Sequence, residues 1–337
     1  MTWKDHLGAD PLPWLLAEDT PAVRTATLQH LLDRPSGDAD LVATRKAAMR
    51  ADPIRSMLEA QDPAGWWVKP GAGYAPKYTG TAWQLIFLDQ LGADAADHRI
   101  QRACDYVLDH AQCVSGGFGA SGTKDSGRPP PSRAIHCLNG NLARALIGFG
   151  RLDDPRLQGA VDWAARSITG SGVERYYPSG TSGPSFECGL NDKKPCAWGA
   201  IKELRGLARI PARQRNPLVR AAIDQGVAFL LSHDPAVADY PMPSGDSRPS
   251  RAWFQPGFPS GYVADMLQGL EVLAELGYAS DPRLADSFRW IEQQQDRGRW
   301  TNRYAYNGKT VVDIEQQGHP SKWVTLRACI VLKARWP

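Results

Sequence analysis

The sequence predicts an all-α fold, a closed α6/α6 toroid in which six helical hairpins form one domain over residues 1–337. Three observations predict it: a glutamine–glycine–aromatic repeat near both ends of the chain, evenly spaced helix starts, and two alternating classes of helix with a period of about 60 residues. The length alone would allow two domains, but the even period favours one.

The repeat is a glutamine that ends a helical segment, followed by a glycine turn and an aromatic residue. It is clearest at Gln295, Gly298 and Trp300, where Trp290-Ile291 precedes it. The same order occurs at Gln61, Gly65 and Trp67, and a looser copy at Gln112, Gly116 and Phe118. A repeated unit of this kind predicts that the same supersecondary element recurs along the chain.

Four helix starts have a physical signature, because an Asp or Asn side chain can accept a hydrogen bond from a free backbone N–H of the first turn. The predicted N-caps are Asp97, Asp154, Asn216 and Asp281, which are 57, 62 and 65 residues apart. Asp154, Asn216 and Asp281 are followed by proline, which fits the first helical position.

These starts and the apolar periodicity predict two helices in each unit. We expect inner helices over 21–33, 79–92, 135–150, 194–209, 259–277 and 321–334. We expect outer helices over 38–60, 96–113, 153–169, 212–233 and 281–296, with Pro11–Ala17 as a sixth. The last helix is apolar rather than a polar cap, which favours a closed ring over an open solenoid.

Composition excludes several classes of function. Lys and Arg number 39 against 36 Asp and Glu, so no basic footprint indicates a nucleic-acid partner. No apolar run is long enough to span a membrane and the N-terminus has no signal core, so the cytoplasm is the expected location. The six cysteines do not resemble a disulfide scaffold at this length. Assembly into a homo-oligomer stays open.

Long loops precede the inner helices, at 61–78, 113–134, 170–194, 234–258 and 297–320, and loops of this length are often functional. They and the first turns that follow are rich in aromatic residues, which in a ring would meet at one end. Aromatic walls suit an apolar ligand and stabilise positive charge. The candidate substrate-binding residues are Trp66, Trp67, Tyr78, Trp83, Phe118, Tyr176, Tyr177, Trp198, Trp253, Phe254, Tyr262, Tyr304, Tyr306 and Trp323. The alternative is that many of the loop aromatics, Trp67 and Trp300 among them, only pack the loops.

Polar residues in the same loops could supply acid–base chemistry. The candidate catalytic residues are His136, Cys137, Cys188, Asp192, Cys196, Asp313 and His319. Cys137 and Cys196 lie where inner helices begin, and a helix N-terminus lowers the pKa of a thiol. Structural roles are the alternative: either histidine could be an ordinary buried or surface residue, Asp192 a loop cap, and Asp313 a support for a loop backbone.

No cofactor is predicted, although zinc remains open. His136, Cys188, Asp192 and Cys196 are chemically suitable ligands, but the cysteines are eight residues apart rather than at the close spacing of zinc fingers. No phosphate-binding loop follows a strand.

The glutamine–glycine–aromatic repeats resemble the QW motif of squalene and oxidosqualene cyclases, and the helix-pair period resembles that of the terpenoid cyclase/protein prenyltransferase α/α-toroid superfamily. The resemblance implies a barrel of hairpins around an apolar, aromatic-lined central cavity and an isoprenoid-like substrate. It covers nearly the whole chain as architecture, but the motif occurs in only two or three of the six repeats.

The chain departs from the family at its catalytic motifs. It has no Asp-x-Asp-Asp acid, no Asp-rich metal motif and no Asp-x-Cys zinc pair, and Asp153-Asp154 begins an outer helix. A cofactor-free linalool dehydratase/isomerase is another barrel of this kind, and its Asp, His, Tyr and two Cys are similar in kind to the candidates above. The resemblance therefore implies a fold more than an activity.

The first hypothesis is an enzyme that uses acid–base chemistry on a small apolar, isoprenoid-like substrate, as an isomerase, dehydratase, hydratase or cyclase. Asp192 or Asp313 would be the acid, and His136 or a thiol the base or relay. The alternatives are a zinc-dependent prenyl or other transferase, a non-enzymatic ligand-binding module, and a carbohydrate lyase or hydrolase. A glycosidase usually needs two facing carboxylates, and the spacing shows no such pair.

Overall fold

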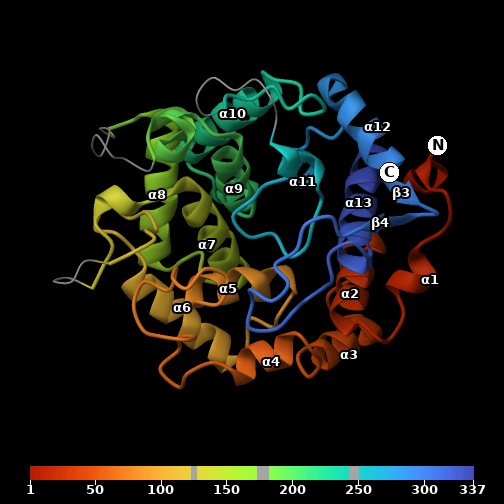
Figure 1. The fold of residues 1–337 in the computed structure, drawn as a ribbon, viewed down its shortest axis with the longest axis horizontal. Helices are drawn as coiled ribbons and strands as arrows, with labels where there is room; N and C mark the ends of the chain where they lie inside the picture. Colours follow the sequence, from red (N-terminus) through yellow and green to blue (C-terminus); the bar gives the residue numbers. More distant parts are fainter. Residues whose placement is uncertain (123–126, 173–181, 243–249) are drawn as a thin grey trace.

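The computed structural model describes residues 1–122, 127–172, 182–242 and 250–337, and its helices follow one another around a ring (Figure 1). From α5 (Thr81–Gln90) onward, consecutive α-helices alternate between the inside and the outside of the ring. The all-α toroid expected from the sequence is confirmed.

The inner helices are α2 (Pro21–Ala26, continued by η2, Thr27–Leu31), α5 (Thr81–Gln90), α7 (His136–Gly148), α9 (Ala197–Ala208), α11 (Met266–Glu275) and α13 (Lys322–Arg335). From α5 to α13 each inner helix packs against the next, and α13 packs against α2 and η2. α11 begins later than the predicted residue 259, because Asp265 caps it by accepting a hydrogen bond from the Gln268 backbone N–H at 2.9 Å.

The outer helices are α3 (Ala39–Ala48), α4 (Ile54–Glu59), α6 (His98–His110), α8 (Pro155–Thr169), α10 (Pro217–Leu231) and α12 (Ala285–Gln293, preceded by η9, Pro282–Leu284). Each of the four predicted caps, Asp97, Asp154, Asn216 and Asp281, accepts a backbone hydrogen bond from the first turn. The single helix expected over 38–60 is wrong. It is two helices, and Pro53, which cannot donate a backbone hydrogen bond, lies between them.

The two ends of the chain meet and close the ring. The short N-terminal helices η1 (Trp3–His6) and α1 (Leu12–Leu15) both contact α13. The Trp3 backbone N–H donates to the Trp336 carbonyl at 2.8 Å. Since α1 has only four residues, the count of six hairpins stays a prediction.

The glutamine of each repeat ties one outer helix to the next outer segment. Gln61 Nε2 donates to the Arg99 carbonyl at 3.0 Å, Gln112 Nε2 to the Arg156 carbonyl at 2.5 Å, and Gln295 Nε2 to the His6 carbonyl at 2.9 Å. The carbonyls of Arg99 and Arg156 lie in the first turns of α6 and α8, and that of His6 lies in η1. The repeat therefore links neighbours on the outside of the ring, and the last copy links the two ends of the chain.

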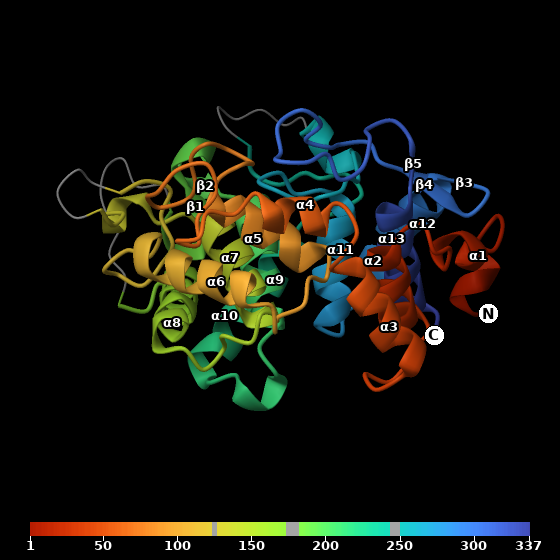
Figure 2. The ribbon, with the colours of Figure 1, turned by 90° about the horizontal axis from the view of Figure 1, so that it is seen from below.

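The long loops and the short strands lie at one end of the ring, which we call the loop end (Figure 2). β1 (Glu187–Cys188) pairs antiparallel with β2 (Lys194–Pro195), and Cys188 lies opposite Lys194. β3 (Gln295–Asp296), β4 (Arg299–Thr301) and β5 (Pro320–Ser321) form a second small antiparallel sheet. In the described part of the chain, no helix has the length and apolar character needed to cross a membrane.

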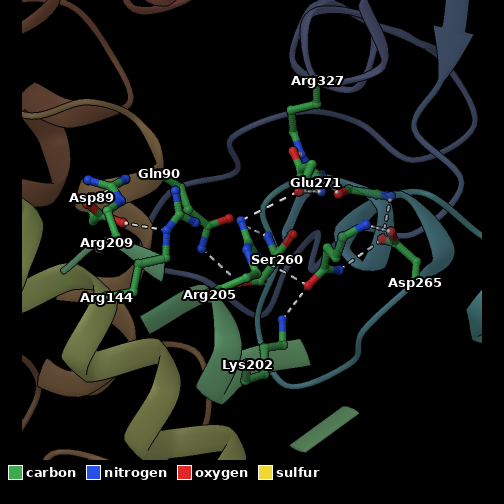
Figure 3. Close-up of polar contacts among 12 residues, drawn as sticks. Asp89, Gln90, Arg144, Lys202, Arg205, Arg209, Ser260, Asp265, Glu271 and Arg327 are labelled. Atoms are coloured by element: carbon green, nitrogen blue, oxygen red, sulfur yellow. Dashed lines mark hydrogen bonds and ion pairs between the residues drawn. The ribbon is translucent and has the colours of Figure 1, made fainter. Parts of the chain in front are cut away.

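Charged side chains converge between the inner helices below the loop end (Figure 3). Arg327 of α13 makes two hydrogen bonds to the Glu271 carboxylate of α11, at 2.6 and 2.7 Å, and Arg205 of α9 lies 3.7 Å from the same carboxylate. We call this group the charged interior: Asp89, Arg144, Lys202, Arg205, Arg209, Asp265, Gln268, Glu271 and Arg327. Its ion pairs and hydrogen bonds lie between inner helices, and the aromatic-lined central cavity that the resemblance implies stays a prediction.

Candidate functional site

An apolar cavity of about 200 Å³ lies at the loop end, above the first turns of α7 and α9. Three of the six cysteines line it, and we call it the thiol cavity. Its lining residues are Cys137, Cys188, Leu190, Asn191, Cys196, Ala197, Trp198, Ala238, Tyr240, Pro241, Met242, Ser250, Trp253 and Tyr262. Cys137, Cys188 and Cys196 are separate candidates in the sequence, and the fold brings them to one cavity.

Each thiol is positioned by the start of an inner helix or by the hairpin before it. Cys137 is in the first turn of α7, Cys196 is the N-cap of α9, and Cys188 is on β1. The Cys196 backbone N–H donates to the Phe186 carbonyl at 3.0 Å, which fixes the hairpin on the helix start. Asn191 Nδ2 donates to the carbonyls of Pro195 at 2.9 Å and Pro241 at 3.1 Å, so the hairpin turn is also held against the opposite wall.

Cys188 is the most acidic of the three cavity thiols. A hydrogen bond from the Cys196 thiol is the largest effect, and it lowers the pKa of Cys188 from its ordinary value near 9 to about 6 against the opposing effect of burial. The backbone N–H groups of Leu190 and Asn191 and the positive charge of the nearby His136 act in the same direction. These effects favour the thiolate form at Cys188 over the other two cavity thiols.

The other two cavity thiols remain protonated. The hydrogen bond that stabilises the Cys188 thiolate raises the pKa of Cys196 well above its ordinary value, and burial adds to this. Burial raises the pKa of Cys137 to about 12. The prediction that the helix N-termini lower both pKa values is wrong. At Cys137 burial outweighs the helix dipole, and at Cys196 the hydrogen bond with Cys188 does so first and burial second.

His136 lies behind the cavity wall and forms a buried pair with Glu203 of α9. It is 2% exposed, and its Nδ1 is 3.0 Å from Glu203 Oε1. Its Nε2 is 3.0 Å from the Gly183 carbonyl, which can only accept, so Nε2 carries a proton. Nδ1 faces the Glu203 carboxyl group, and burial raises the pKa of Glu203 against the opposing effect of its hydrogen bond with His136.

The hydrogen bonds of this pair hold the segment that leads into β1. The His136 backbone N–H donates to Ser182 Oγ at 2.9 Å, while the ring holds Gly183. Asn139 Nδ2 donates to both oxygens of Glu203, at 3.2 and 3.1 Å. The ring nitrogens of His136 are thus engaged away from the cavity, and His136 is not among the residues that line it.

Four aromatic rings complete the cavity: Trp198, Tyr240, Trp253 and Tyr262. The Tyr240 hydroxyl donates to the Leu230 carbonyl at 2.8 Å, and Trp253 Nε1 donates to the Pro235 carbonyl at 2.8 Å. Because these polar atoms bind backbone carbonyls outside the lining, the cavity receives mainly the apolar parts of the two rings. Trp198, Trp253 and Tyr262 were among the predicted substrate-binding residues.

The predicted acids do not line this cavity. Asp192 is exposed on the hairpin turn between β1 and β2. Asp313 is exposed, and its carboxylate accepts a hydrogen bond from the Gly308 backbone N–H at 2.8 Å, which is the loop-supporting role considered as the alternative. His319 is exposed, and its backbone carbonyl accepts from the Asn302 N–H at 2.8 Å.

Most of the other predicted aromatic residues pack loops instead of lining the thiol cavity. Trp67 Nε1 donates to the Met57 carbonyl and Trp83 Nε1 to the Tyr74 carbonyl, and Phe118 is fully buried. The rest pack as follows: Trp66 is half-buried, Trp323 stacks on Phe258, Tyr78 and Tyr304 contact Tyr306, and Phe254 contacts Trp290. Tyr176 and Tyr177 lie outside the described residues. The large apolar area of the described rings explains why they pack in the core.

Sequence reasoning missed Glu203 and the charged interior, although a signal was present. The segment predicted as an inner helix contains Lys202, Glu203 and Arg205, and an inner helix is covered on nearly every side. Buried charges must be paired. Three charged residues in such a helix therefore indicate partners on neighbouring inner helices, as the structure shows for each of them.

The described residues contain no group of three or more His, Cys, Asp or Glu side chains that could hold a metal ion. In particular, His136 points to Glu203 and Gly183, and Asp192 is exposed. The residues considered as a zinc set therefore do not assemble into one.

Comparisons with known proteins give only distant structural similarities. No family model matches the chain, and no curated protein matches it. Among solved structures, the chain is similar to the type II terpene cyclase MstE from Scytonema in complex with geranylgeranyl dihydroxybenzoate. The two sequences are 19% identical, the alignment covers 95% of this chain and 88% of that chain, and the TM-score is 0.45.

Two carbohydrate-active proteins give similar values. An unsaturated glucuronyl hydrolase specific for heparin has 12% identity, coverage of 94% and 85%, and a TM-score of 0.48. A cellobiose 2-epimerase from Spirochaeta thermophila has 15% identity, coverage of 80% and 75%, and a TM-score of 0.47. Similarity at this level does not identify a reaction for this chain.

Proposed function

We propose that the protein is an enzyme that transfers protons to and from a small apolar substrate in the thiol cavity, with Cys188 as the base and Cys196 as the acid. The observation that carries this proposal is the pairing of a thiolate and a thiol on one apolar wall. Two groups of the same kind whose environments move their pKa values apart are a recurring arrangement for acid–base catalysis. The other titratable side chains of the described lining are Cys137, Tyr240 and Tyr262, and burial raises the pKa of each of them.

The chemistry follows from the protonation states. Cys196 gives its proton to a leaving hydroxyl, or to a double bond, while the Cys188 thiolate takes a proton from a neighbouring carbon of the substrate. The hydrogen bond between the two sulfur atoms then returns the proton from Cys188 to Cys196. The net reaction is a dehydration or a double-bond shift, and it leaves the enzyme unchanged.

The walls favour a reaction in which positive charge develops on carbon. The faces of Trp198, Tyr240, Trp253 and Tyr262 can stabilise a cation, as aromatic rings do at about 0.5–2 kcal/mol each. The cavity of about 200 Å³ is smaller than the roughly 300 Å³ at which sites for drug-sized ligands begin. A short allylic alcohol of the isoprenoid type fits both requirements.

The His136–Glu203 pair serves as a positioning group in this proposal. It fixes the segment that leads to Cys188 through the hydrogen bonds of His136 to Ser182 and Gly183. Asp192, Asp313 and His319 have no role in the proposed chemistry.

A panel of short isoprenoid alcohols, assayed for dehydrated and isomerised products, tests the proposal. Cys188→Ala should reduce the rate roughly 10²- to 10⁴-fold, the usual contribution of a general base. Cys104→Ala is the matched control, because Cys104 is a buried thiol of α6 that is not in the cavity lining. Equal rates for wild type and Cys188→Ala would contradict the proposed chemistry. Ligand binding without turnover by any variant would favour a binding module.

A further inference from the structure

A second hollow, separate from the thiol cavity, opens at the loop end and has a volume of about 490 Å³. It is lined by Arg251, Phe254, Gln255, Thr301, Arg303, Gln317 and Gly318, and we call it the arginine hollow. The short helix η8 (Arg251–Phe254) contributes to both spaces, with Trp253 in the thiol cavity and with Arg251 and Phe254 in the hollow. Neither the resemblance nor the proposed chemistry accounts for it.

The hollow has an unbalanced positive charge. Two guanidinium groups line it, and no acidic side chain occurs among its described lining residues. Within the described part of the chain, the side chains of Arg251 and Arg303 form no ion pair and no hydrogen bond. By contrast, Arg327, Arg283 and Arg156 each pair with a carboxylate at less than 3 Å. The two arginines are therefore available to a ligand.

The rest of the lining adds hydrogen-bond donors and one apolar surface. Gln317 Oε1 accepts from the Ala305 backbone N–H at 3.2 Å, which leaves its Nε2 as a donor. The described residues offer no protein hydrogen-bond partner to the Gln255 amide. Phe254 gives the hollow an aromatic wall. The combination is complementary to an oxygen anion that carries an apolar group.

We infer that the arginine hollow binds an organic oxyanion, a carboxylate or a phosphate monoester, between Arg251 and Arg303, with the body of the ligand against Phe254. Arginine recognises both anions through its planar fork of donors, and such charge-assisted hydrogen bonds are about twice as strong as neutral ones. The volume exceeds what an inorganic anion needs, and the aromatic wall explains the preference for an organic body. This site does not depend on the proposed thiol chemistry.

The test is calorimetric titration of the full-length chain with benzoate and with phenyl phosphate, and with benzyl alcohol as the uncharged probe. The wild type should bind at least one of the two anions saturably, more weakly as salt is added, and should not bind benzyl alcohol. R251Q and R303Q should each weaken binding about tenfold or more, which corresponds to about 1.4 kcal/mol. The anion that binds more tightly identifies the group that the site prefers.

R213Q is the matched control, because Arg213 is exposed in η6 (Ala212–Gln214) and its side chain likewise forms no ion pair or hydrogen bond within the described part of the chain. It should bind the anions as the wild type does. Thermal unfolding of the variants checks that each has the wild-type fold. The inference is overturned if neither anion binds saturably, if benzyl alcohol binds equally well, or if R251Q and R303Q bind as R213Q does.

Discussion

The two ends of α7 and α9 lie in opposite environments. At the loop end, the first turns carry Cys137, Ala197 and Trp198 around an apolar cavity. Two or three turns further along the same helices, Arg144, Arg205 and Arg209 belong to the charged interior (Figure 3). One pair of helices therefore supports a chemical site at one end and an ionic core at the other. The comparison predicts that substitutions at the first end change reactivity and that substitutions at the second change stability.

The largest stability effect is expected at Glu271, the carboxylate between Arg205 and Arg327. Glu271→Gln leaves buried guanidinium groups without a counter-charge, so it should lower the free energy of unfolding by about 3–5 kcal/mol. Urea unfolding measures this. Asp286→Asn is the control, because Asp286 pairs with Arg289 on the exposed surface and should lose no more than about 1 kcal/mol. A similar loss of unfolding free energy in both variants would contradict the distinction between the buried and the exposed ion pair.

The charged interior should also make the fold sensitive to acid. Burial alone would raise the pKa of Glu271, but Arg327 and then Arg205 outweigh it and lower the pKa from 4.5 to about 2. A lowered pKa of an acid stabilises the fold fully above the unfolded value of 4.5, and this stability is lost as pH falls from 4.5 to 2. The contribution is about 3 kcal/mol. Unfolding of wild type and Glu271→Gln at pH 7 and pH 3 should show a smaller acid-dependent loss in the variant. An equal acid-dependent loss of stability in the wild type and in Glu271→Gln would contradict the role assigned to Glu271.

The smallest stability effect is expected at the loop end. Cys188 is half-buried on a cavity wall, so Cys188→Ala should change the free energy of unfolding by no more than about 1 kcal/mol. The same substitution at fully buried Cys104 should cost more, because it leaves an unfilled space between packed helices. A loss at Cys188 as large as that of Glu271→Gln would mean that the thiol supports the fold.

The order of the helices could be predicted from the sequence because helix caps and repeat motifs are local signals. A cap such as Asp154 acts within its own first turn, and Gln295 belongs to a repeat whose spacing can be read directly. The break at Pro53 was missed because the apolar pattern continues across it. The late start of α11 was missed because Asp265, its actual cap, was not recognised.

The candidate site could be predicted only in part, because some of its properties depend on contacts that form only in the folded chain. The three cavity cysteines could be selected because each lies at or before the start of an inner helix. Their relative acidity could not be predicted, because it depends on the hydrogen bond between Cys188 and Cys196 and on burial in the folded wall. Which aromatic rings line the cavity also depends on how the loops cross one another, and sequence spacing does not determine that.

The acidity of the Cys188 thiol is the property on which the proposed function depends most directly. Alkylation by iodoacetamide, followed residue by residue with mass spectrometry across a range of pH, measures it, since only the thiolate reacts. The reactivity of Cys188 should rise with a midpoint near pH 6, and Cys196→Ala should move that midpoint toward the ordinary value near 9. Cys137 and Cys104, whose pKa values burial raises to about 12, should stay unreactive at neutral pH. A Cys188 midpoint near 9 in the wild type, unchanged by Cys196→Ala, would contradict the thiolate–thiol pair and the function proposed from it.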